Sequence, residues 1–99
     1  MQNEDIFYTN NEFKGLTDEQ LISQVKQGGQ KALTYLLGKY KELVNVKVSK
    51  YFMIGAEKED IVQEGMIGLF KAIKTFDVNN KQNTFKTFAN MCIERQLIT

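Results

Sequence analysis

The chain has 99 residues and a formal net charge of +1, and 42% of its residues are hydrophobic, enough for one small domain with a modest core. This near-neutral charge counts against a stand-alone DNA-binding protein, and no stretch approaches the roughly 18 continuous apolar residues of a membrane span. A single cysteine, Cys92, fits a reducing cytoplasm, and the lack of histidine excludes His-based acid–base catalysis and most zinc sites.

The first segment, residues 1–15, has no clear hydrophobic periodicity and is rich in asparagine and acidic residues, unlike a secretory signal. We expect a flexible N-terminal arm in which Ile6, Phe7 or Phe13 packs locally. The remainder, residues 16–99, is expected to form one helical domain, because the composition lacks proline and is rich in leucine, isoleucine, lysine and glutamine.

A first helix is expected to begin at Thr17. Residues 17–20, TDEQ, form a capping box, in which the Thr17 hydroxyl accepts from the backbone N–H of Gln20 and the Gln20 side chain reaches back. An apolar stripe follows, formed by Leu21, Ile22 and Val25. The pair Gly28-Gly29 is expected to end the helix.

A second helix is expected over residues 30–52. Its buried face has helical spacing and comprises Leu33, Leu36, Leu37, Tyr40, Val44, Val48 and Tyr51. The alternating valines 44, 46 and 48 are also typical of a strand, but the helical rhythm continues on both sides and outweighs them. Four lysines lie off the buried face: Lys39, Lys41, Lys47 and Lys50. A solvated surface is the favoured interpretation, and a weak phosphate-facing surface is the alternative.

A third helix is expected from near Glu57 to Thr75, because acidic residues in a first turn suit the positive end of the helix dipole. At about 100° per residue it divides into two faces. The predicted core face comprises Ile61, Val62, Gly65, Leu69, Ala72 and Ile73. The opposite face comprises Asp60, Gln63, Glu64, Ile67, Lys71 and Lys74, with Phe70 at its edge. Gly65 would let another helix approach the core face, and Gly68, at the border, would do the same for an incoming partner.

The polar face of this third helix carries a hydrophobic centre. Ile67 lies among charged residues, where a helix selected only for solubility would carry a charge. A lone exposed hydrophobe usually has no function. Ile67 together with Phe70 and nearby Met66, however, is rimmed by polar side chains, as protein interfaces are. We therefore interpret this face as a docking surface for a protein partner.

A polar loop over residues 77–83 leads to a fourth helix, which Asn83 or Thr84 is expected to cap. The predicted core face of this helix comprises Phe85, Ala89, Cys92, Ile93 and Gln96, and a flank beside it comprises Phe88, Met91, Arg95 and Ile98. The sequence ends without the glycine, proline or basic last turn that usually closes a helix. We therefore expect a truncated chain whose helix continues in a longer protein. Four helices with short connections predict an all-α bundle.

Residues 60–77, DIVQEGMIGLFKAIKTFD, closely resemble the second conserved region of bacterial RNA polymerase sigma factors, and the resemblance extends over residues 16–99. The sequences of the segment QEGMIGL and of the later phenylalanine-rich helix are most similar to those of the sigma-H type of alternative sigma factor. The resemblance implies the helical fold of sigma region 2 and docking on the coiled coil of the β′ subunit of core RNA polymerase. Positions that contact this coiled coil in the family match Asp60, Gln63, Glu64, Met66 and Phe70, and the helical pattern adds Ile67.

The resemblance also implies a role in opening the −10 region of promoter DNA, since Phe85 and Phe88 match family aromatics with that role. An aromatic ring stacks on an unpaired base with about 1–3 kcal/mol per base. For Phe85 a core position is the favoured alternative, and for Phe88 the two interpretations are balanced. Primary sigma factors have a tryptophan pair where this chain has Met91-Cys92, so melting would rest more on Phe88, Arg95 and base capture in a pocket. Met91 is a further candidate for contact with DNA.

Catalysis finds little support in the sequence, and we expect no cofactor and no metal. Cys92 lies on a predicted core face without a histidine to activate it, which favours a packed side chain over a nucleophile. The sequence therefore predicts part of a sigma-H-like initiation factor that binds core polymerase and the non-template strand of the −10 region, with an anti-sigma factor as a further candidate partner. The alternative is a helical adaptor that uses the same Ile67 and Phe70 surface and has no DNA function.

Overall fold

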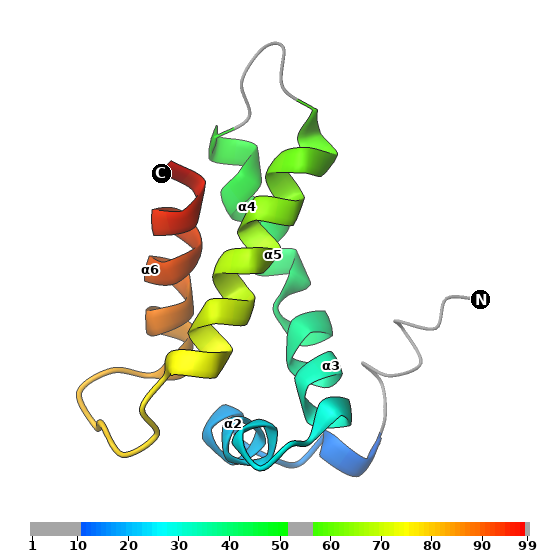
Figure 1. Ribbon diagram of the computed structural model, residues 1–99, viewed down its shortest axis with the longest axis vertical. Coiled ribbons are helices and arrows are strands. Elements are labelled where there is room, and N and C mark those ends of the chain that lie inside the picture. The colour runs from blue at the N-terminus through cyan, green and yellow to red at the C-terminus, as the bar shows by residue number, and fades with distance from the viewer. Residues whose placement is uncertain (1–10, 52–56, 99) are drawn as a thin grey trace.

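The computed structural model describes residues 11–51 and 57–98, and these ranges are all-helical, as predicted (Figure 1). In chain order the elements are the 3-10 helix η1 (Asn11–Phe13), α2 (Asp18–Lys26), α3 (Gln30–Lys39), α4 (Lys41–Tyr51), α5 (Lys58–Thr75) and α6 (Phe85–Ile98). Five α-helices therefore stand in the described ranges where four were expected. Figure 1 shows α5 crossing in front of α4 beside α6, with α2 seen end-on at the foot of the bundle.

The start of α2 confirms the predicted capping box. The backbone N–H of Gln20 donates to Thr17 Oγ1 at 3.1 Å, and the backbone N–H of Thr17 donates to Gln20 Oε1 at 2.8 Å. Gly28 adopts a φ of 97°, which a residue with a side chain rarely adopts, and it follows the end of α2. Phe13 is buried in the core, whereas Ile6 and Phe7 lie outside the described residues.

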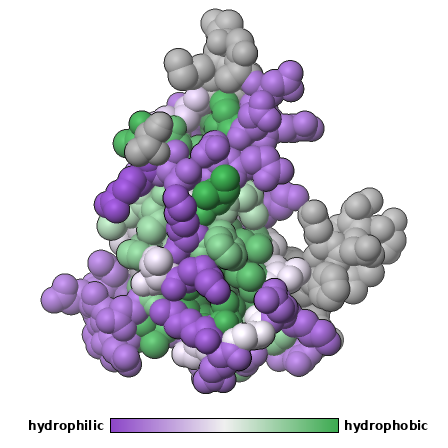
Figure 2. Space-filling view, viewed as in Figure 1, coloured by the Kyte–Doolittle hydropathy of each residue, from purple (hydrophilic) through white to green (hydrophobic). Residues whose placement is uncertain are grey.

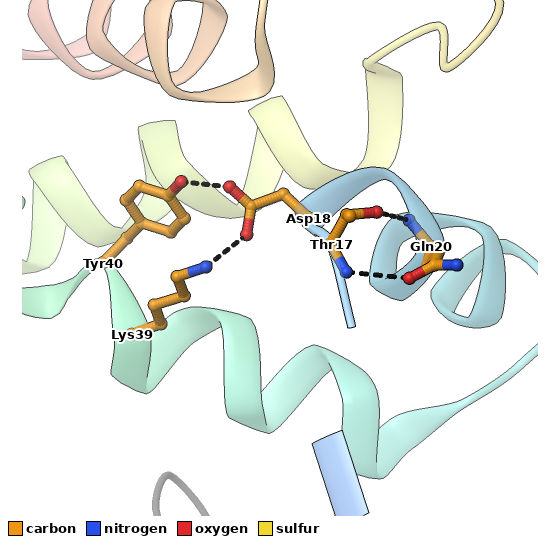
Figure 3. Close-up of polar contacts among 5 residues, drawn as sticks. All are labelled: Thr17, Asp18, Gln20, Lys39 and Tyr40. Atoms are coloured by element: carbon orange, nitrogen blue, oxygen red, sulfur yellow. Dashed lines mark hydrogen bonds and ion pairs between the residues drawn. The ribbon is translucent and has the colours of Figure 1, made fainter. Parts of the chain in front are cut away.

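The prediction of a single helix over residues 30–52 was wrong, because the chain turns at Tyr40 between α3 and α4. Gly38 weakens the helix just before this turn. The turn brings two side chains to the same carboxylate: Figure 3 shows that the Tyr40 hydroxyl and the Lys39 ammonium both reach Asp18 of α2. The Lys39 Nζ lies 2.6 Å from Asp18 Oδ1. Residue 52, the expected end, lies outside the described residues.

Two glycines on α5 allow the close packing of its neighbours. A Cβ on Gly65 would lie 2.7 Å from Val44 Cγ1 on α4, which confirms the close approach predicted for this core position. A Cβ on Gly68 would lie 2.9 Å from both the carbonyl oxygen of Cys92 and the Cα of Ile93 on α6. The surface of Gly68 was predicted to receive a partner, and this was wrong, because α6 covers it.

The remaining core positions follow the predicted faces in part. Fully buried side chains from α5 and α6 are those of Leu69, Ala72, Ile73, Phe85, Ala89 and Ile93. Seven other predicted core residues are only half-buried, namely Leu33, Leu37, Tyr51, Ile61, Val62, Cys92 and Gln96. Thr84 rather than Asn83 caps α6, since its Oγ1 accepts from the backbone N–H of Thr87 at 3.2 Å. Lys26 Nζ of α2 donates to the carbonyl oxygen of Phe76 at 2.6 Å and so fastens α2 to the end of α5.

Candidate functional site

The exposed side of α5 presents the apolar centre that the sequence predicted. We define the α5 face by six residues: Asp60, Gln63, Glu64, Met66, Ile67 and Phe70. Ile67 and Phe70 are 41% and 42% exposed, Met66 is half-buried, and the three polar residues are exposed. Figure 2 shows apolar surface over the middle of the side on which α5 lies in front, bordered by hydrophilic atoms. An apolar centre with a polar rim on a well-packed helix is suited to a protein partner.

Charge is graded along this face of α5. Asp60 and Glu64 lie toward the N-terminal end, and Lys71 and Lys74 lie toward the C-terminal end, an arrangement that complements the helix dipole. Lys74 Nζ lies 5.9 Å from the centre of the Phe70 ring, within the range of a cation–π contact. A partner that covers Ile67 and Phe70 would therefore meet a negative rim at one end of the patch and a positive rim at the other.

A hollow of about 340 Å³ adjoins the α5 face on the side of α3 and α4. Its lining consists of Thr34, Leu37, Gly38, Lys41, Val62, Gln63 and Met66. Sequence reasoning missed this hollow because it assigned Leu37 and Val62 to the buried core, and both are half-buried in the structure. The signal that would have revealed it is Gly38, which leaves a gap in the helix surface just before the turn at Tyr40.

A second hollow lies between α5 and α6 and has a volume of about 420 Å³. We call it the α5/α6 groove, and its lining consists of Lys71, Thr75, Phe88, Met91, Cys92, Arg95 and Gln96. The groove brings together three of the four residues that were predicted to contact DNA, namely Phe88, Met91 and Arg95. Met91 is 44% exposed and Phe88 is half-buried. The groove thus combines an aromatic ring with the positive charges of Lys71 and Arg95.

Phe85, the fourth of those residues, does not reach the groove. Its side chain is fully buried, so an exposed position for it was wrong and the core alternative is correct. The ring packs edge-on against Tyr40 at 5.4 Å and against Phe76 at 5.5 Å between ring centres. Phe76 in turn lies 5.3 Å from the Phe88 ring. Phe76, which itself packs against Phe85, therefore supports the Phe88 ring on its inner side, and Phe88 still lines the groove.

A hydrogen-bonded bridge connects the α5 face with the α5/α6 groove. Gln96 Nε2 donates to Glu64 Oε1 at 2.8 Å, and Lys71 Nζ donates to Gln96 Oε1 at 3.1 Å. Gln96 therefore touches one residue of each surface with the two ends of its amide. Sequence reasoning placed Gln96 on the core face of its helix, because no local pattern indicates a partner that lies 32 residues away.

Two of the four lysines that were considered as a phosphate-facing surface are instead tied to carboxylates. Lys39 pairs with Asp18, and Lys47 Nζ lies 2.6 Å from Glu94 Oε2. The hydrogen bond and charge of Lys47 hold the pKa of Glu94 below its usual value. These contacts favour the interpretation of an ordinary structural surface for Lys39 and Lys47.

The described residues offer little for catalytic chemistry. Burial raises the pKa of the Cys92 thiol, which keeps it protonated and a poor nucleophile at neutral pH. Within residues 11–51 and 57–98, no cluster of three or more histidine, cysteine, aspartate or glutamate side chains could hold a metal ion. In the same ranges no helix has the length and apolar character to cross a membrane.

Comparison with known proteins gives matches over most of the chain. The model of the Sigma-70 region 2 family matches residues 29–99. The RNA polymerase sigma-H factor of Bacillus subtilis is 48% identical over 99 residues, which are all of this chain and 45% of that protein. The sigma-H factor of Bacillus licheniformis is 50% identical over 92 residues, or 93% of this chain and 41% of that protein. The ECF RNA polymerase sigma-E factor of Escherichia coli is 38% identical over 61 residues, or 62% and 31% of the two chains.

This chain thus spans less than half of the length of the two Bacillus relatives. No solved structure gives a significant match to it.

Proposed function

Because the chain belongs to the Sigma-70 region 2 family, we propose that it is the part of a sigma-H-type transcription initiation factor that attaches the factor to RNA polymerase and to promoter DNA. The family match and the identity of about half of all positions to two Bacillus sigma-H factors support this proposal. The chain acts through binding, without a catalytic step, and it works in the cytoplasm, where the polymerase acts.

The α5 face is the proposed docking surface for core polymerase, with the coiled coil of the β′ subunit as the partner. The observation that carries this proposal is the exposure of Ile67 and Phe70 on a helix whose other sides are packed against α4 and α6. A packed helix holds these side chains in place before binding, so little conformational entropy is lost when a partner covers them. Asp60, Gln63 and Glu64 supply the acidic and polar rim, which suits basic groups on the partner.

The α5/α6 groove is the proposed contact for the non-template strand of the −10 region. An unpaired base stacks on the open side of Phe88, and Met91 adds apolar contact beside it. Lys71 and Arg95 attract the phosphates that flank the base. Phe85 contributes indirectly in this proposal, since its ring supports Phe76, which packs behind Phe88.

The proposed binding of DNA by this chain alone is weak. Its net charge is only +1, so the general electrostatic attraction that dominates affinity for DNA is small. In the complete enzyme the polymerase supplies most of the positive channel and orders the strand. An anti-sigma factor that covers the α5 face would block docking by competition for Ile67 and Phe70.

The test is a titration of the chain against core RNA polymerase, and separately against the isolated β′ coiled coil, beside an Ile67→Lys variant. A Val46→Lys variant is the matched control, because Val46 is 50% exposed on α4, away from the α5 face. We expect the parent and Val46→Lys to bind equally, and Ile67→Lys to bind at least about tenfold more weakly, as for a central interface residue.

The other results would revise the proposal in different ways. Equal binding by the parent and Ile67→Lys would move the interface away from the α5 face. Failure of the parent to bind either polymerase sample would refute docking on polymerase and favour a helical adaptor, which would use the same exposed residues for another protein.

A further inference from the structure

The hollow beside the α5 face, with a volume of about 340 Å³, combines apolar surface with one positive charge. We call it the α3/α5 hollow. Leu37 of α3 and Val62 and Met66 of α5 line it and are only half-buried, so part of their apolar surface remains exposed to solvent. Among the described residues, the lining includes one charged side chain, that of Lys41, and no acidic one. This chemistry suits an occupant that carries apolar side chains next to an acidic group.

The described part of the chain begins close to this hollow. The 3-10 helix η1 is fixed to α3, because Phe13 is buried and its ring centre lies 5.4 Å from that of Tyr35 (Figure 1). Thr34, the neighbour of Tyr35, lines the hollow, and so does Gly38 one turn later on α3. An extended chain spans up to about 3.5 Å per residue, whereas a helix rises only about 1.5 Å per residue. The residues that precede Asn11 are therefore long enough to reach the hollow.

The first ten residues, MQNEDIFYTN, have a composition that complements the hollow. They contain two acidic side chains, Glu4 and Asp5, and no basic one, and the apolar pair Ile6-Phe7 follows the acidic pair directly. All 13 basic residues and the other 10 acidic residues lie in residues 11–99, which therefore carry a formal charge of +3. Burial of apolar surface and attraction between opposite charges both favour contact between the two parts of the chain.

We propose that residues 1–10 occupy the α3/α5 hollow, with Ile6 and Phe7 against its apolar lining and Asp5 beside Lys41, and that they compete there with a protein partner for the α5 face. The competition rests on the function proposed above, whereas the seat of this segment in the hollow does not.

The competition follows from residues that the two surfaces share. Gln63 and Met66 belong to the α5 face and also line the α3/α5 hollow. An occupant of the hollow therefore covers one edge of the docking surface and leaves its centre, Ile67 and Phe70, uncovered. A partner that needs the whole face must displace the segment, so the chain limits access to its own docking surface.

A weak contact is sufficient for this effect, because the segment is part of the same chain. A short flexible link gives an effective concentration of about a millimolar. If the intrinsic dissociation constant of the contact is about half a millimolar, the segment occupies the hollow about two thirds of the time. A competing partner then binds about threefold more weakly than it would bind a chain whose segment cannot enter the hollow.

The first test detects the seat of the segment without any partner. The chain contains no tryptophan, so Phe7→Trp in the full chain introduces a single fluorophore at the proposed contact. We expect its emission maximum to lie at a shorter wavelength than in urea, and Lys41→Glu to shift it toward the urea value. Lys50→Glu is the matched control, because Lys50 is exposed on the same helix, changes the charge equally and does not line the hollow.

The second test measures the competition by titration of the full chain against the isolated β′ coiled coil. The double variant Ile6→Ser/Phe7→Ser removes the apolar pair and keeps the length and charge of the segment. We expect it to bind about threefold more tightly than the parent. The control, Gln2→Ser/Asn3→Ser in the same segment, should bind as the parent does.

The possible contrary results are distinct. Emission from Phe7→Trp at the urea value in the folded chain, or equal shifts from Lys41→Glu and Lys50→Glu, would overturn the seat in the hollow. Equal binding by the parent and Ile6→Ser/Phe7→Ser would overturn the competition. If neither bound the coiled coil, docking on polymerase would fail and the competition with it, while the emission measurement would still decide whether the segment occupies the hollow.

Discussion

Gly68 offers the sharpest test of how α5 and α6 pack, because a single added methyl group would meet the neighbouring backbone. In the structure, a Cβ at this position would lie 2.9 Å from Cys92 O, 2.9 Å from Ile93 Cα and 3.0 Å from Gln96 Cβ. The first two are backbone atoms, which cannot turn aside as a flexible side chain does. A Gly68→Ala substitution must therefore push α6 away from α5.

The expected loss of stability is the difference between two terms. Alanine gains up to about 1 kcal/mol over glycine from helix propensity. Overpacking of a close contact costs about 1–3 kcal/mol, and backbone neighbours place this case at the upper end. Gly68→Ala should therefore lower the free energy of unfolding by about 1–2 kcal/mol.

Urea denaturation followed by circular dichroism would measure this change, with Gly15→Ala as the matched control. A Cβ on Gly15 meets nothing within 4 Å, and its φ is not positive, so the control should be neutral or stabilising by up to about 1 kcal/mol. If Gly68→Ala were as stable as the parent chain, with an unchanged slope of the denaturation curve, the close approach of α5 and α6 would be refuted.

Two further substitutions probe the ring cluster and its anchor. Tyr40→Phe removes the hydroxyl that donates to Asp18 and should cost about 1.5 kcal/mol in urea denaturation at neutral pH. Burial and then the Asp18 contact raise the pKa of Tyr40, so the folded state keeps the proton longer than the unfolded state. The stabilisation from the Tyr40 hydroxyl is complete below the usual tyrosine pKa of about 10 and fades above it. The loss of unfolding free energy in Tyr40→Phe should therefore shrink in alkaline solution. A loss that stays constant with pH would contradict the assigned hydrogen bond to Asp18. Phe88→Leu keeps an apolar side chain but loses stacking, and should weaken oligonucleotide binding in an anisotropy titration about fivefold or more, whereas an unchanged affinity would exclude Phe88 from strand contact.

The local features of the fold could be predicted from the sequence because each depends on neighbouring residues. The capping box needs only Thr17 and Gln20, which are three residues apart. The buried positions of Leu69 and Ile73 and the exposure of Ile67 follow from helical periodicity alone. The same periodicity therefore predicts the α5 face as a docking candidate, although it does not predict the half-burial of Met66.

The features that were wrong or missed depend on contacts between distant parts of the chain. The turn at Tyr40 is tied to Asp18, which lies 22 residues earlier. The surface at Gly68 was wrongly predicted to receive a partner, because a helical-wheel projection of α5 does not show where α6 lies. Phe85 and Phe88 have similar local patterns, yet only the first is enclosed, because Tyr40 and Phe76 pack against it on two sides.

The packing of α5 explains why the two proposed functions share one helix. Gly65 lets α4 approach one side and Gly68 lets α6 approach another, so the remaining side is the one left for a partner. The groove lies along the contact with α6, and Gln96 crosses from that groove to Glu64. Any change in the spacing of α5 and α6 must therefore alter the groove and the bridge together. For this reason Gly68→Ala should also weaken the binding of a single-stranded oligonucleotide in the groove, even under conditions in which the domain remains folded.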